Sequence, residues 1–166
     1  MMIPLRPVLG GLLLAVAVLA FPVFAQEQAA EPGLSSPRAT FEAFLGSMRE
    51  AQKGDRAALD AAIATLNLSE VPSIVREEAG PKTANDLKNY LDRLELIRID
   101  RIPTEVEGDR WVYRKGPAGE VSLIRGEDGR WLFSAKTIAA LPDLLDSVRG
   151  REFAEGTRDP GGAPRG

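Results

Sequence analysis

The acid–base chemistry open to this 166-residue chain depends on carboxylates, because the sequence contains no histidine and no cysteine. The Ser-His-acid triad, the Cys-His dyad and ordinary zinc sites each need one of those two residue types. Neighbouring acids occur at Glu77-Glu78 and Glu127-Asp128, and a carboxylate pair can divide the roles of acid and base. A solvated helix face or turn explains these pairs more simply in a chain with 24 acidic residues. We therefore predict no catalytic residues.

Phosphate, metal and nucleic-acid binding also lack a sequence signal. Neither G-x-x-x-x-G-K-[ST] nor G-x-G-x-x-G occurs, and there is no D-x-D-x-D-G calcium loop. The formal net charge is −3, whereas a nucleic-acid-binding domain shows a basic patch or stripe. We predict no cofactor, no metal site and no nucleic-acid partner.

Two pairs of aromatic side chains are spaced for strands. Trp111 and Tyr113 are two residues apart, as are Trp131 and Phe133, so each pair points to one face of a strand. Such a stripe either lines a ligand cavity under a curved sheet or packs against helices, and we favour core packing. Ser134 and Thr137 follow where a helix is expected to begin, with Ser134 as its N-cap.

The elements that carry these residues begin with helices. Ser36 and Pro37 have the residue types of an N-cap and a first helical position, and apolar residues recur at helical spacing from Phe41 to Met48. A second helix is expected after Asp55, a short helical piece near Pro72, and a third helix over 82–96.

The spacing of apolar residues then changes to a period of two, which is typical of strands. We predict strands at 96–100, 110–115, 120–126 and 130–135, the last three joined by Gly-rich hairpin turns. A final helix over 135–148 is expected to be interrupted or restarted at Pro142. The predicted class is α+β: N-terminal helices, an antiparallel β-meander and a C-terminal helix.

The sequence predicts one domain with additional segments at both ends. Arg6, the apolar run 9–24 and the small-x-small sequence Val23-Phe24-Ala25 predict a signal peptide over 1–25, with an uncleaved membrane anchor as the alternative. We expect a linker at 26–35, one globular domain at 36–149 and a disordered tail at 150–166. The predicted location is outside the cytoplasm, periplasmic or secreted.

Short motifs in a fixed order run through this domain. They are Ser36-Pro37-Arg38-x-Thr40, Phe44-Leu45, Leu66-x-Leu68-Ser69, Gly80-Pro81, Leu87-Lys88-x-x-Leu91-Asp92-Arg93, Ile99-Asp100-x-Ile102-Pro103, Gly108 and Trp131-x-Phe133-Ser134-x-x-Thr137-Ile138. In this order the chain resembles the extramembrane N-terminal region that precedes the channel in a group of bacterial MscS-type small-conductance mechanosensitive channel proteins. The resemblance covers about 36–148.

The resemblance implies a soluble periplasmic domain with no enzymatic activity. In the family the domain is followed by membrane helices and a pore module, which we do not find here, so we expect no channel activity from this chain alone. A stand-alone relative, the product of a split or truncated gene and a subunit that joins a separate membrane partner all remain open. The charged matches Lys88, Asp92, Arg93 and Asp100 are the candidate interaction residues, although Asp92 and Arg93 also suit an intramolecular salt bridge.

Two functions from different classes follow. The first is a non-catalytic interaction or accessory module of the cell envelope, whose partner is an envelope membrane protein such as an MscS-type channel subunit. The second is an NTF2-like small-molecule binding protein or enzyme, since helices followed by an antiparallel meander also suit that cone-shaped fold. Such a protein would use Asp and Tyr side chains in an apolar cavity. A spacer domain without a dedicated ligand is a third reading.

Overall fold

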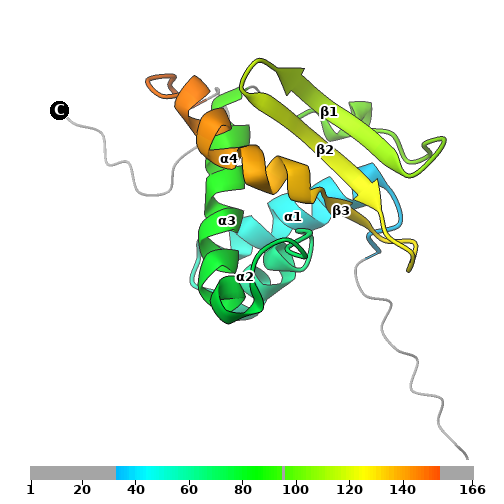
Figure 1. Ribbon diagram of the computed structural model, residues 1–166, viewed down its shortest axis with the longest axis horizontal. Coiled ribbons are helices and arrows are strands. Elements are labelled where there is room, and N and C mark those ends of the chain that lie inside the picture. The colour runs from blue at the N-terminus through cyan, green and yellow to red at the C-terminus, as the bar shows by residue number, and fades with distance from the viewer. Residues whose placement is uncertain (1–32, 95, 154–166) are drawn as a thin grey trace, which may run out of the picture.

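The computed structural model describes residues 33–94 and 96–153. The predicted α+β class is confirmed, because four α-helices pack together with a three-stranded antiparallel sheet (Figure 1). The predicted signal peptide, most of the linker and most of the tail lie outside the described residues. The elements in chain order are α1 (Pro37–Ala51), α2 (Arg56–Ile63), α3 (Ser73–Leu94), a 3-10 turn η1 (Ile99–Arg101), β1 (Arg110–Gly116), β2 (Gly119–Arg125), β3 (Trp131–Phe133) and α4 (Ala135–Ser147).

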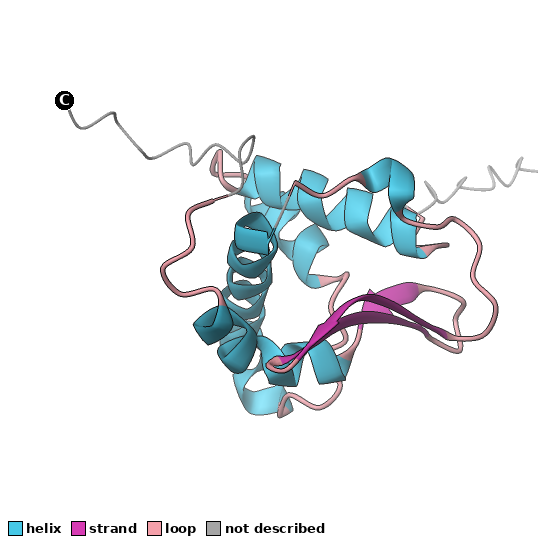
Figure 2. Cartoon of the chain, turned by 90° about the horizontal axis from the view of Figure 1, so that it is seen from above, coloured by secondary structure: helices cyan, strands magenta, loops and turns pink. Residues whose placement is uncertain are grey.

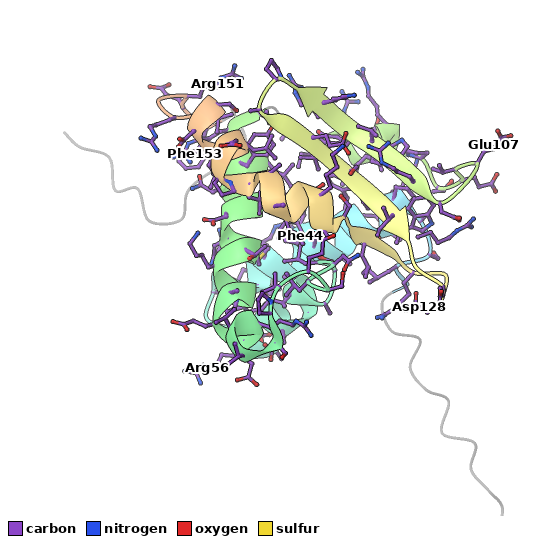
Figure 3. All side chains as sticks on the ribbon, in the orientation of Figure 1. Phe44, Arg56, Glu107, Asp128, Arg151 and Phe153 are labelled. Carbon is purple, nitrogen blue, oxygen red and sulfur yellow. The ribbon has the colours of Figure 1, made fainter. Side chains whose placement is uncertain are left out.

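Helix α1 begins as the sequence predicts. The Ser36 hydroxyl accepts a hydrogen bond from the Ala39 amide at 3.1 Å, and Pro37 occupies the first turn, where an N–H has no helical partner. The helix buries Phe41, Phe44 and Met48 on one face. This apolar face supplies the centre of the core, where Figure 3 labels Phe44.

The three strands lie in the order β1-β2-β3, each antiparallel to the next. Seen from above, they form one twisted layer at one side of the helices (Figure 2). Trp111 pairs with Leu123, and Leu123 pairs with Phe133, so one row of apolar side chains crosses the sheet. The Phe41 ring of α1 contacts this layer, with its centroid 5.0 Å from that of Phe133. The stripe of Trp131 and Phe133 therefore packs as core, as we favoured, whereas Trp111 and Tyr113 are half-buried against that core.

The predicted strand at 96–100 is wrong. Ile97 and Ile99 are half-buried against the core, which produces the alternating pattern without strand pairing. This segment is instead attached to the start of α1. The Arg38 amide donates to the Pro103 carbonyl at 3.2 Å, and Arg38 Nε donates to the Ile102 carbonyl at 2.7 Å. The Asp100 carbonyl likewise accepts a hydrogen bond from Arg38 Nη2 at 3.2 Å. Carbonyl groups at the end of this segment and just after it thus bond to Arg38 of α1, and the chain turns through η1.

The predicted helix break before residue 82 is also wrong, because α3 runs unbroken through Pro81. Proline removes the bond to the carbonyl four residues earlier, that of Glu77, which belongs to an exposed residue and is open to water. Gly80 packs closely on Ile63 of α2, and a Cβ built there would lie 3.1 Å from that side chain. Helix α4 likewise continues past Pro142, which is exposed.

The NTF2-like assignment stays a prediction. The face of the sheet that contacts α1 is filled by aromatic side chains. The ring centroids of Phe41 and Tyr113 are 4.9 Å apart, and those of Phe44 and Phe133 are 5.3 Å apart. Phe41, Phe44 and Phe133 are completely buried.

Candidate functional site

The junction between β3 and α4 is a buried network of hydroxyl groups. Ser134 caps α4 by accepting a hydrogen bond from the Thr137 amide at 3.1 Å, as predicted. The Thr137 hydroxyl accepts from the Ser122 amide at 2.8 Å and lies 3.1 Å from the Ser122 carbonyl. Ser122 Oγ and Ser134 Oγ are 2.8 Å apart. The Ser122 carbonyl still accepts a hydrogen bond from the Ser134 amide at 2.9 Å, so it is the Ser122 amide for which Thr137 supplies the partner that β3 no longer provides.

One buried carboxylate, Glu120 on β2, extends this network. It forms an ion pair with Arg110, accepts a hydrogen bond from Ser122 Oγ at 3.2 Å and lies 3.5 Å from Lys136 Nζ. The hydrogen bond from Arg110, followed by that from Ser122 and the two positive charges, holds the pKa of Glu120 below its usual range against the opposing effect of burial. The carboxylate therefore stays ionised at neutral pH, which suits a structural ion pair and does not suit a general acid.

The hydroxyl network has no unsatisfied group for a substrate to complete. In the described part of the chain, every buried side-chain nitrogen and oxygen has a hydrogen-bond partner. The same residues contain no group of three or more carboxylates placed to hold a metal ion. The network is best explained as the connection between the sheet and α4.

The predicted interaction residues of α3 are engaged within the helix. Lys88 forms an ion pair with Asp92 one turn later, and both side chains are mostly buried. Arg93 bonds to the Asn89 side chain and lies over the Phe153 ring, 4.5 Å from its centroid. The intramolecular salt bridge expected for Asp92 is therefore present, with Lys88 as the partner the structure assigns.

Asp100, the remaining predicted residue, lies in η1 at the surface. It forms an ion pair with Arg98 at 3.1 Å, and the hydrogen bonds from Arg98 lower the pKa of this carboxyl and raise the pKa of the guanidinium. Both side chains are more than half exposed, so the pair contributes little to stability.

Arg98 also lines a surface groove of about 210 Å³ beside β1, which we call the β1 groove. Trp111 and Tyr113 form its aromatic wall, and both are only half-buried. The remaining lining residues are Leu96, Arg101 and Ile102. Leu96 is 53% exposed, so its apolar surface is accessible at the groove.

Sequence reasoning found only part of this groove. The spacing of Trp111 and Tyr113 identified an aromatic face, but Leu96 and Arg98 were assigned to a strand that does not exist. The signal present in the sequence was the pair Arg98 and Arg101, three residues apart, which predicts a basic rim once 96–102 is read as a loop.

The acid pairs singled out for chemistry are spread over the surface. Glu77 and Glu78 are exposed on α3, and Glu127 and Asp128 lie in the turn between β2 and β3. The side-chain hydrogen bond from Arg130 lowers the pKa of Asp128, which keeps it charged. None of these acids lines any of the pockets described here.

Comparison with known proteins gives no match: no protein-family model, no curated protein and no solved structure is similar to this chain. The resemblance to the N-terminal region of MscS-type channel proteins thus stays a prediction. Within the described residues, no helix combines the length and apolar character needed to cross a bilayer.

Proposed function

We propose that the chain is a non-catalytic, exported domain that binds a protein partner of the cell envelope through the β1 groove. The observation that carries this proposal is the composition of the groove. Tryptophan, tyrosine and arginine are the residue types most enriched among those that dominate protein–protein binding energy. Here Trp111 and Tyr113 form the wall, and Arg98 and Arg101 form the rim.

The aromatic wall is ordered before any partner binds. Phe41 supports both rings from beneath, with its centroid 6.2 Å from that of Trp111 and 4.9 Å from that of Tyr113. Side chains already fixed in position lose little rotamer entropy on association, so more of the contact energy is available for affinity.

The proposed partner is a pore subunit of an MscS-type channel. Support for this choice comes from the sequence resemblance and from Asp100, whose ion pair holds Arg98 at the groove. Lys88 and Asp92 are mostly buried in their ion pair, whereas the Asp100 side chain is 65% exposed, so Asp100 is the first of the four predicted residues to examine.

The alternative function, that of an NTF2-like enzyme or small-molecule binder, finds no support in the lining of the pockets. It would need a carboxylate inside a cavity, with its pKa raised by burial. The β1 groove has no carboxylate in its lining. Another pocket, lined by residues of α1 and α2, includes Asp60, and this residue is exposed.

Site-specific photocrosslinking tests the proposal in cells that contain an MscS-type channel subunit. A photoreactive amino acid replaces Arg101 in the groove of the tagged full chain. A matched variant carries it at Arg56 of α2, which Figure 3 shows at the end of the molecule away from the β1 strand. We expect the Arg101 variant to crosslink to the channel subunit and the Arg56 variant not to do so.

A second pair of variants tests the charges. Arg98→Glu with Arg101→Glu should abolish the crosslink, while Arg56→Glu leaves it intact. Equal crosslinks from the groove and control positions would refute the groove as the binding surface. An exported, folded chain that never crosslinks to the channel subunit would refute the proposed partner.

A further inference from the structure

A second pocket lies where the ends of α3 and α4 meet the β1–β2 turn (Figure 1). Its volume is about 360 Å³, within the range typical of small-molecule sites. Leu94, Leu144 and Val148 give it an apolar floor, and Tyr90, Lys115 and Arg151 bring polar groups to it. We call it the hairpin pocket.

The hairpin pocket gathers cations on a chain that is acidic overall. Arg114, Lys115 and Arg151 line it, although the formal net charge of the chain is −3. Lys115 and Arg151 form no ion pair with any residue the structure describes, so their charge is not cancelled there. A local excess of one charge inside a concavity concentrates ions of the opposite sign.

Tyr90 adds a hydroxyl group to the same site. The residue is 4% exposed, and burial raises the pKa of its phenol while the charges of Arg114 and Arg151 act in the opposite direction. Tyr90, Arg114 and Arg151 all line the hairpin pocket. The raised pKa keeps the hydroxyl protonated at neutral pH, so it can donate a hydrogen bond to an anion.

Two helix ends bring negative partial charge toward the pocket, and it must be weighed against the cations. Each helix C-terminus carries about half a negative charge, located on its last carbonyls. Those of α4 are partly satisfied within the chain: Leu144 O accepts from Ser147 Oγ at 2.6 Å, and Leu145 O accepts from the Val148 amide at 3.2 Å. Lys115 and Arg151 bring two full positive charges to the pocket, against about one negative charge from the two helix ends together.

We propose that the hairpin pocket binds the phosphate group of an organic phosphate, supplied either by a small soluble ester or by a phospholipid headgroup. Arginine and lysine side chains with a protonated phenol supply several charge-assisted donors, which match an oxyanion with several acceptor oxygens. The apolar floor would contact the carbon part of the ligand. This site is separate from the β1 groove and does not depend on the protein-binding role proposed above.

Binding is tested on the full chain with three probes at constant ionic strength: inorganic phosphate, glycerol 3-phosphate and phosphatidylglycerol vesicles. Phosphatidylcholine vesicles serve as the neutral control. We expect the double variant Lys115→Gln/Arg151→Gln to weaken binding about tenfold or more, since each charge-assisted hydrogen bond is strong. The matched double variant Arg56→Gln/Arg149→Gln removes the same net charge outside the pocket and should change affinity less than about twofold.

Tyr90→Phe gives a second readout that keeps the ring and removes only the hydroxyl. This substitution should weaken the affinity for glycerol 3-phosphate severalfold and leave the circular dichroism spectrum unchanged. If the parent chain binds the soluble ester and the pocket variants do not, the ligand is a small phosphate. If binding is confined to anionic vesicles, the ligand is a phospholipid headgroup. Absence of binding to every probe, or equal loss in the pocket and control variants, overturns the proposal.

Discussion

Thr137 takes the place of a strand at the point where β3 ends. Its hydroxyl serves the amide and the carbonyl of Ser122, both inside the molecule. The change Thr137→Val keeps the shape of the side chain but leaves the Ser122 amide without a partner. We expect the free energy of unfolding to fall by about 1–3 kcal/mol, the cost of an unsatisfied buried group. Urea denaturation with an unchanged m-value would measure it.

Thr83→Val is the matched control for that substitution. The Thr83 hydroxyl donates to the Ala79 carbonyl at 2.8 Å on the half-buried side of α3, where the carbonyl is already bonded within the helix. A smaller loss is expected there. If both variants lose the same free energy, the Ser122 amide has found another partner and the role given to Thr137 is wrong.

The ion pair of Glu120 predicts a pH-dependent stability. Its pKa in the folded chain lies below its unfolded value, chiefly because Arg110 donates to it. The stabilisation is therefore fully present above the unfolded pKa of about 4.3 and is lost as the pH falls through the lower folded value. Glu120→Gln should be less stable than the parent at pH 7, and the gap should narrow as the pH falls below about 4.

Urea denaturation of the two proteins across this pH range measures the gap. Glu50→Gln is the control, because the Glu50–Lys53 pair is exposed on both sides and should contribute little at any pH. A gap for Glu120→Gln that stays constant between pH 7 and pH 3 would contradict an ionised Glu120 in the folded chain.

These residues show which part of the site the sequence could predict. The cap formed by Ser134 depends on residues within one helical turn, so residue type and spacing were enough. The environment of Glu120 was not predictable in the same way, because Arg110 lies on another strand and Lys136 on a helix. Strand register, which sequence alone does not fix, decides that Arg110 and Glu120 share one face.

The approach of the β1–β2 hairpin to α4 depends on a glycine. Gly119 begins β2 with φ +137°, and a Cβ built on it would lie 2.8 Å from the Cβ of Ala140. Gly119→Ala should therefore add an overpacking cost of about 1–3 kcal/mol to the cost of the backbone conformation. Thermal and urea unfolding would measure the total.

Gly108→Ala isolates the backbone cost, since Gly108 also has a positive φ of +80° but no atom near a built Cβ. The variant Gly119→Ala/Ala140→Gly should recover part of the overpacking cost, which a double-mutant cycle detects as coupling between the two sites. Equal losses of unfolding free energy in Gly119→Ala and Gly108→Ala would show that α4 moves away from the added methyl group at no energetic cost.

At the scale of elements, the errors of sequence interpretation have one physical source. Periodicity reports which side chains face the core and says nothing about where the backbone hydrogen bonds go. Ile97 and Ile99 face the core from an irregular segment whose neighbouring carbonyls bond to Arg38. The helical piece near Pro72 and the helix over 82–96 were expected as separate elements, yet contact of α3 with α2 at Gly80 favours one continuous helix through Pro81.

For the whole molecule, the α+β class was predictable, apart from the strand at 96–100 and the division of α3, and the surfaces were not. Helix caps and hairpin turns are local signals, and they gave the α+β class. The β1 groove combines the loop after α3 with the wall of β1, and the hairpin pocket combines the ends of two helices with a turn. Both depend on tertiary contacts between distant segments, so no local pattern could identify them.

The central contacts of Phe41 predict that helices and sheet unfold together. Its ring touches Trp111 and Phe133, which joins α1 to β1 and β3. The two tryptophans, Trp111 and Trp131, both lie in strands, so fluorescence reports the sheet while far-ultraviolet circular dichroism reports mainly the helices. The two signals should give one coincident transition in urea.

Phe41→Ala should lower the free energy of unfolding by about 3–5 kcal/mol, the cost of a cavity left by a buried phenyl ring. Because one core joins both kinds of element, the fluorescence and dichroism midpoints should move together. Phe153 is 42% exposed, so Phe153→Ala should change neither the fluorescence midpoint nor the dichroism midpoint by much. A fluorescence midpoint that falls alone would mean that the sheet can separate from the helices, and that residues 36–149 do not form one cooperative unit.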